Sequence, residues 1–115
     1  MKKAYKIALA AVMVTGLAGF GTAGTVEDHV VEQKDKTFFY KGQKADKLTI
    51  KVGDVVHFKN MDPYFHNVFS LSDVKLFDLG SFPQGQEKTV VFNKAGKVEV
   101  ECAIHPQMHV TLEVK

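Results

Sequence analysis

Residues 97–114 read KVEVECAIHPQMHVTLEV, and this stretch decides the fold. Valine alternates with lysine and glutamate up to Cys102, and a second alternation of apolar and polar residues begins at Val110. Apolar residues at every second position are typical of a strand with one buried face. The stretch therefore predicts two half-buried strands joined by a short loop, with Cys102 on the core face of the first.

The same pattern extends upstream through the chain. Short apolar or alternating runs separated by turn residues predict further strands around residues 48–52, 56–58, 68–71 and 89–92. Only residues 72–78 have a composition that could hold a turn of helix. Several short strands with frequent turns predict an all-β fold, a small antiparallel sandwich or barrel.

The N-terminal segment has the pattern of an export signal. Lys2, Lys3 and Lys6 precede an apolar run over residues 7–20, and small residues follow over 21–24. We predict that residues 1–24 are a signal peptide that is cleaved, which leaves residues 25–115 as one domain in the periplasm or otherwise exported. An uncleaved anchor is the alternative, but a membrane span needs about 20 apolar residues.

Charge and cysteine content exclude several classes of function. All fifteen basic residues are lysines, and without Lys2, Lys3 and Lys6 the remaining chain is close to neutral against thirteen acidic residues. Without arginine or a basic cluster, the sequence gives no support for nucleic-acid binding. It also lacks the basic amphipathic helix that would indicate stable membrane association. A single cysteine in an exported protein is a free thiol, an intermolecular bridge or a metal ligand.

The loop between the two C-terminal strands carries three residues that can bind a soft metal. Cys102, His105 and Met108 recur at every third position, and His66 stands upstream in the pair His66-Asn67. When the alternation of the last strand is continued backward along the chain, the side chain of Met108 points inward and that of His109 points outward. The same counting places His57 outward, and no partner can be named for His29.

Each of these side chains also has an ordinary structural interpretation. A buried cysteine or methionine is usually core packing, and a histidine before proline can simply shape a turn. Thiolate, thioether and imidazole together are nevertheless the donors that copper prefers in both of its oxidation states. The combination therefore favours a site for one copper ion, built from His66, Cys102, His105 and Met108.

These residues resemble the motifs of the cupredoxins, the small blue-copper proteins. The loop Cys102-Ala103-Ile104-His105-Pro106-Gln107-Met108 is similar to a short cupredoxin ligand loop, and His66-Asn67-Val68 is similar to the upstream histidine motif. The resemblance implies a Greek-key sandwich, a type 1 copper site with Met108 as a weak axial ligand, and a role for Asn67 in tying the two ligand segments together. It also implies that His105 reaches the surface through an apolar patch.

The function that follows is electron transport rather than enzymatic catalysis. We predict a monomeric carrier that moves single electrons between transient redox partners through Cu(I) and Cu(II). A copper carrier or buffer for the periplasm, in which the metal is cargo, is the alternative. A cysteine hydrolase using Cys102 and His105 has no orienting group or oxyanion donor in its favour, and a thioether is unusual in a zinc site.

Overall fold

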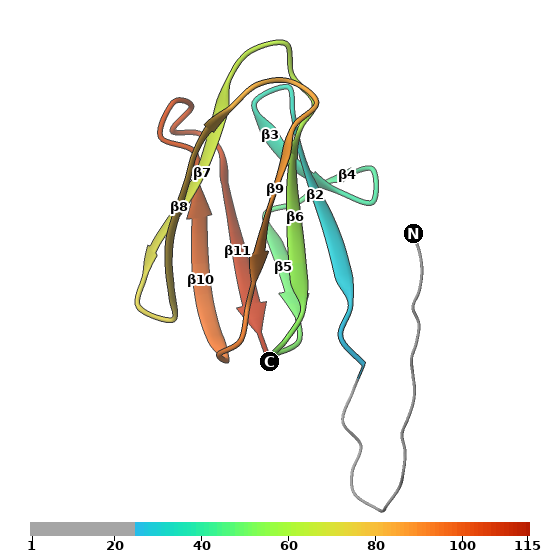
Figure 1. The fold of residues 1–115 in the computed structure, drawn as a ribbon, viewed down its shortest axis with the longest axis vertical. Coiled ribbons are helices and arrows are strands. Elements are labelled where there is room, and N and C mark those ends of the chain that lie inside the picture. Colours follow the sequence, from blue (N-terminus) through green and yellow to red (C-terminus); the bar gives the residue numbers. More distant parts are fainter. Residues whose placement is uncertain (1–24) are drawn as a thin grey trace, which may run out of the picture.

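Residues 25–115 form two five-stranded sheets that face each other in a computed structural model of the chain (Figure 1). The predicted signal peptide, residues 1–24, lies outside the described residues. Within the described part of the chain, no helix has the length and apolar character needed to cross a membrane. The predicted all-β sandwich is confirmed.

The strands follow the chain from β2 to β11. Their bounds are β2 Asp28–Lys34, β3 Thr37–Tyr40, β4 Gln43–Lys44, β5 Lys47–Ile50, β6 Val55–Asn60, β7 His66–Ser72, β8 Lys75–Phe82, β9 Glu87–Val91, β10 Gly96–Glu101 and β11 His109–Val114. One sheet has the order β5-β11-β10-β7-β8, and the other has the order β4-β3-β2-β6-β9.

The pairing is mostly antiparallel, as the sequence predicted, with two exceptions. Val98 of β10 lies opposite Leu112 of β11 in an antiparallel pair, which confirms the two C-terminal strands. Strand β5 runs parallel to β11, and β2 runs parallel to β6. A parallel pair cannot be closed by a tight hairpin. Each parallel pair joins two strands that are separated in the chain by other strands.

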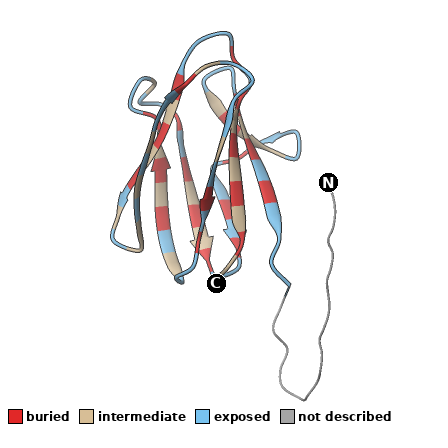
Figure 2. Ribbon diagram, viewed as in Figure 1, coloured by how far each residue is buried: buried red, intermediate tan, exposed pale blue. Residues whose placement is uncertain are grey.

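Alternation of buried and exposed residues along the strands places the core between the sheets, and Figure 2 shows it as bands of colour. Four phenylalanines are fully buried there: Phe38, Phe58 and Phe82 from strands of the two sheets, and Phe92 just after β9. Cys102 and Met108 belong to the same core, each with 1% exposure. The inward orientation predicted for both side chains is therefore confirmed.

Residues 72–78 form a hairpin and not the turn of helix that their composition allowed. Strands β7 and β8 pair from Ser72 and Lys75 onward, and only two residues separate them. Val74 in this turn packs against Gly96, where an added Cβ would lie 2.5 Å from Val74 Cγ2. Packing between distant segments and cross-strand pairing decide this turn, and a local composition pattern contains neither.

The turn between β2 and β3 brings its backbone toward the end of the sandwich that holds Cys102. Asp35 and Lys36 both have positive φ, 53° and 56°, as in the two-residue turns that are common in β-hairpins. Their N–H groups donate to the carboxylate of Asp62, at 2.7 Å and 3.1 Å. This contact fixes Asp62 four residues before His66.

Candidate metal centre

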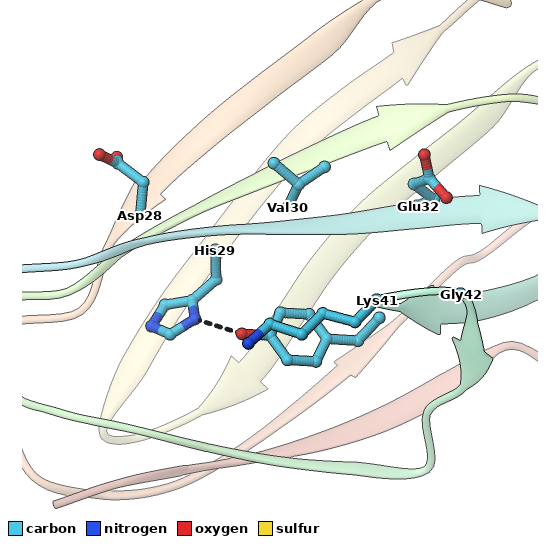
Figure 3. A pocket seen from close by; sticks show the side chains of 7 residues that line it. Asp28, His29, Val30, Glu32, Lys41 and Gly42 are labelled. Atoms are coloured by element: carbon cyan, nitrogen blue, oxygen red, sulfur yellow. Dashed lines mark hydrogen bonds between the residues drawn. The ribbon is translucent and has the colours of Figure 1, made fainter. Parts of the chain in front are cut away.

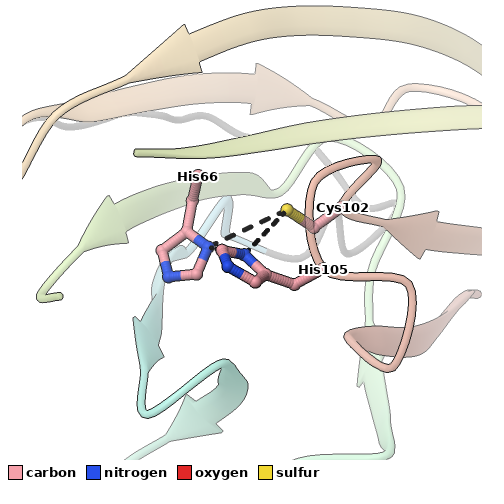
Figure 4. A group of neighbouring side chains, drawn as sticks. All are labelled: His66, Cys102 and His105. Atoms are coloured by element: carbon pink, nitrogen blue, oxygen red, sulfur yellow. Dashed lines mark hydrogen bonds between the residues drawn. The ribbon is translucent and has the colours of Figure 1, made fainter. Parts of the chain in front are cut away.

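Three of the predicted ligand side chains converge on one point. His66 begins β7 and is fully buried, Cys102 follows the last residue of β10, and His105 lies in the loop before β11. Figure 4 shows the two imidazoles and the thiol turned toward one another. His66 pairs with Phe82 of β8, so it lies within the sheet and not in the loop before it.

The distances between the donor atoms fit a bound metal ion. Cys102 Sγ lies 3.8 Å from His66 Nδ1 and 3.9 Å from His105 Nδ1, and the two nitrogens are 3.1 Å apart. The centre of such a triangle is about 2.1 Å from each atom, close to the roughly 2.0 to 2.3 Å of metal bonds to nitrogen and sulfur. The donors also form a group suited to a metal by residue type.

The fourth predicted ligand, Met108, ends the loop. Its backbone N–H donates to the carbonyl of His105 at 2.9 Å, which closes the loop into a turn. Its side chain is buried in the core, whereas His109 beside it is 47% exposed and bonds Glu99 Oε1 at 2.8 Å. The loop therefore presents Met108 to the interior and His109 to solvent, as the alternation predicted.

Asp62 holds the imidazole of His66 and was not identified from the sequence. His66 Nε2 donates to Asp62 Oδ2 at 2.7 Å. Burial disfavours the charge of this carboxylate, but hydrogen bonds from His66 and from the Asp35 and Lys36 amides outweigh it and lower the pKa of Asp62. The proton is thereby kept on Nε2, which leaves the Nδ1 lone pair directed at Cys102 and His105.

Asn67 links the two segments that supply the donors. Its backbone N–H donates to Cys102 Sγ at 3.5 Å, and its side-chain Oδ1 accepts a hydrogen bond from Ala103 N at 2.7 Å. The contacts that the resemblance implied for Asn67 are therefore present. A hydrogen bond to the sulfur is one of the factors that tune a metal-bound thiolate.

Aromatic and apolar side chains lie beside the centre or next to its histidines in the chain. The ring of Tyr64 lies 5.4 Å from the rings of both His66 and His105. Phe65 and Ile104 nearby in the chain are 55% and 47% exposed. Burial, followed by the charges of His66 and Lys36, lowers the pKa of His105, which favours the neutral imidazole that a metal requires.

The two remaining histidines lie outside this centre. His57 faces outward, as predicted, and bonds Asp28 at 2.9 Å. His29, for which the sequence named no partner, is buried between Tyr40 and Asp54, with bonds of 2.8 Å and 2.9 Å. Figure 3 shows the His29 ring bonded to the tyrosine hydroxyl beside a pocket along β2.

The fold is similar to solved structures of amicyanin. A point mutant of amicyanin in the Cu(I) state has a TM-score of 0.66 and 24% identity, covering 76% of this chain and 82% of that chain. Amicyanin from Paracoccus versutus (Thiobacillus versutus) has the same TM-score and identity, with 76% of this chain and 81% of that chain covered. The chain has the cupredoxin fold.

The sequence comparisons add one relative of this chain. Methylamine utilization protein MauL of Methylorubrum extorquens is 34% identical over 68 residues, which are 58% of this chain. The match spans 60% of the length of that relative. No protein-family profile matches the chain.

Proposed function

We propose that this cupredoxin is an exported electron carrier with one copper ion bound by His66, Cys102, His105 and Met108. The convergence of His66 Nδ1, Cys102 Sγ and His105 Nδ1 within 3.1 to 3.9 Å of one another carries the proposal. Bound copper would supply a one-electron couple, because thiolate and thioether suit Cu(I) while imidazole also suits Cu(II). The similar amicyanin structure in the Cu(I) state agrees with this metal.

The protein's own contribution is a rigid set of donors. Strands β7 and β10 fix His66 and Cys102, Asp62 fixes the tautomer of His66, and Asn67 donates to the sulfur. Side chains held by packing and hydrogen bonds change little when one electron is added. A site that does not rearrange between Cu(I) and Cu(II) supports fast electron transfer.

Electrons would enter and leave near His105. The exposed side chains of Tyr64, Phe65 and Ile104 suit a brief, weak encounter with a redox partner, for which small apolar contacts are sufficient. We further propose that residues 1–24 direct export and are then removed, which would leave a monomer in the periplasm. The N-terminal mass of the exported protein tests this cleavage.

The visible spectrum after addition of Cu(II) to the metal-free protein tests the copper site. We expect an intense charge-transfer band from the Cys102 thiolate, bleached by a reductant and restored by an oxidant. Cys102→Ser should abolish the band, whereas the control His109→Ala should keep it. Copper that binds tightly without a reversible colour change would instead indicate a cargo carrier.

A further inference from the structure

Gln33 is a buried amide whose place in the core needs an explanation. It lies on the inward face of β2 with 0% exposure, and its Oε1 has no hydrogen-bond partner among residues 25–115. Its Nε2 donates to the backbone carbonyl of Asn67 at 3.3 Å, across the sandwich. A buried polar atom without a partner typically costs about 1 to 3 kcal/mol, so this position is unfavourable for stability alone.

The orientation of the Gln33 amide follows from the group that it faces. Because the Asn67 carbonyl can only accept, the side of the amide that faces it must be the NH₂ group, and Oε1 is the atom left over. The pairing of β7 with β8 shifts register between Asn67 and Phe69. At this irregularity, the Asn67 carbonyl bonds the side chain of the opposite sheet.

Asn67 is therefore held by three hydrogen bonds with different roles. Gln33 bonds its carbonyl, Ala103 bonds its side chain, and its own N–H donates to Cys102 Sγ. The last of these bonds has an N···S distance of 3.5 Å, which is ordinary for a sulfur acceptor, and it keeps that geometry only while the Asn67 backbone stays in place. Gln33 restrains that backbone from the opposite sheet.

We propose that Gln33 is a positioning residue that fixes the Asn67 N–H against Cys102 Sγ and thereby raises the reduction potential of the centre. The inference rests on the proposed copper function. An N–H donated to the sulfur withdraws charge from it and favours the reduced, more electron-rich state. Loosening Asn67 weakens that bond and lowers the potential.

Replacing Gln33 by methionine separates this role from simple packing. Gln33→Met keeps most of the volume and removes both the unpaired oxygen and the bond to Asn67. We expect its copper stoichiometry and midpoint of unfolding to stay close to those of the wild type, while the reduction potential falls and the charge-transfer band shifts. Gln43→Met, the same change at an exposed position of β4, is the matched control and should change neither the reduction potential nor the charge-transfer band.

The outcomes distinguish this inference from the proposed function. A wild-type protein that forms no copper band overturns the proposed function and this inference with it. A coloured wild-type protein whose potential and band are unchanged in Gln33→Met overturns the inference alone. A lower potential in Gln33→Met, with the Gln43→Met value at that of the wild type, supports it.

Hydrogen exchange in the metal-free wild-type protein gives a test that no variant can confound by misfolding. Slow exchange of the Gln33 side-chain amide and of the Asn67 backbone N–H, followed by nuclear magnetic resonance, supports the restraint of Asn67 by Gln33. In a folded Gln33→Met variant, the Asn67 N–H should exchange several-fold faster. Exchange of the wild-type Gln33 amide at the rate of an exposed glutamine would overturn the proposal.

Discussion

At the scale of single residues, Asp62 joins two segments beside the proposed copper site. Its carboxylate receives the N–H groups of Asp35 and Lys36 and the Nε2 proton of His66. It therefore couples the geometry of the β2–β3 turn to the orientation of a proposed ligand. A residue that holds a ligand histidine in this way usually contributes 10- to 100-fold to metal affinity.

Asp62→Asn should weaken both the fold and the site. An amide cannot accept all three hydrogen bonds as a carboxylate does, so we expect a loss of about 1 to 3 kcal/mol in the free energy of unfolding. Copper affinity should fall by about 10- to 100-fold, measured by competition with a chelator. The control Asp73→Asn removes an exposed carboxylate in the β7–β8 turn and should leave the affinity unchanged. Equal affinities for the two variants would contradict the role given to Asp62.

Met108→Leu should change the electron affinity of the site without emptying it. A weak axial thioether tunes the potential but contributes little to holding the ion. Leucine retains the buried apolar volume, so the variant should fold and bind one copper ion with a shifted potential. Complete loss of copper would show that Met108 is a principal ligand, and an unchanged potential would show that it is not a ligand.

The residues that alternation alone could place are those at strand ends. Cys102, Met108 and His109 lie in or beside regular strands, so their inward or outward orientation followed from counting. Gln33 contacts Asn67, which is 34 residues away, and the Asp35 and Lys36 amides that orient Asp62 are 27 and 26 residues from it. No local pattern contains these contacts, although the bond from His66 to Asp62 spans only four residues. His29 was left without a partner for the same reason, since Asp54 is 25 residues away.

The hairpin of β7 and β8 depends on a close approach to the start of β10. Gly96 has a φ of 139°, and Val74 from the hairpin turn occupies the space where a Cβ would project. A glycine at this point permits both the backbone conformation and the contact. The β7 strand that this hairpin supports also carries His66.

Gly96→Ala should destabilise the protein by about 1 to 3 kcal/mol, because it adds both backbone strain and a steric clash. Unfolding in urea measures the loss. The double variant Val74→Ala with Gly96→Ala should recover the part due to the clash and retain the part due to φ. A Gly96→Ala protein as stable as the wild type would contradict the contact with Val74.

At the scale of the whole sandwich, the free energy of unfolding should depend on pH through Asp54, which is not one of the proposed copper ligands. Burial opposes its charge, but bonds from His29 and from the Lys51 and Glu27 amides outweigh it and lower the pKa of Asp54 to about 2. Because the folded pKa lies below the unfolded value of 3.8, this contribution is present above pH 3.8. It is lost as the pH falls through 3.8 toward 2.

Urea unfolding of the metal-free protein between pH 2 and 5 measures this dependence, and Asp54→Asn provides the comparison. The variant should be less stable near pH 5 and should lose less stability than the wild type as the solution is acidified. Parallel curves for the two proteins would contradict the low pKa of Asp54. Asp73→Asn, which removes an exposed carboxylate in the β7–β8 turn without touching Asp54, should follow the wild type.

The sandwich as a unit brings two strand ends and one loop together around a single proposed copper ion. A redox titration of the copper-loaded protein, followed at the thiolate charge-transfer band, tests that claim most directly. We predict one copper ion per chain and a reversible one-electron curve that is the same in the oxidative and reductive directions. A colourless copper complex, or a curve that does not return on reoxidation, would contradict the electron-carrier function.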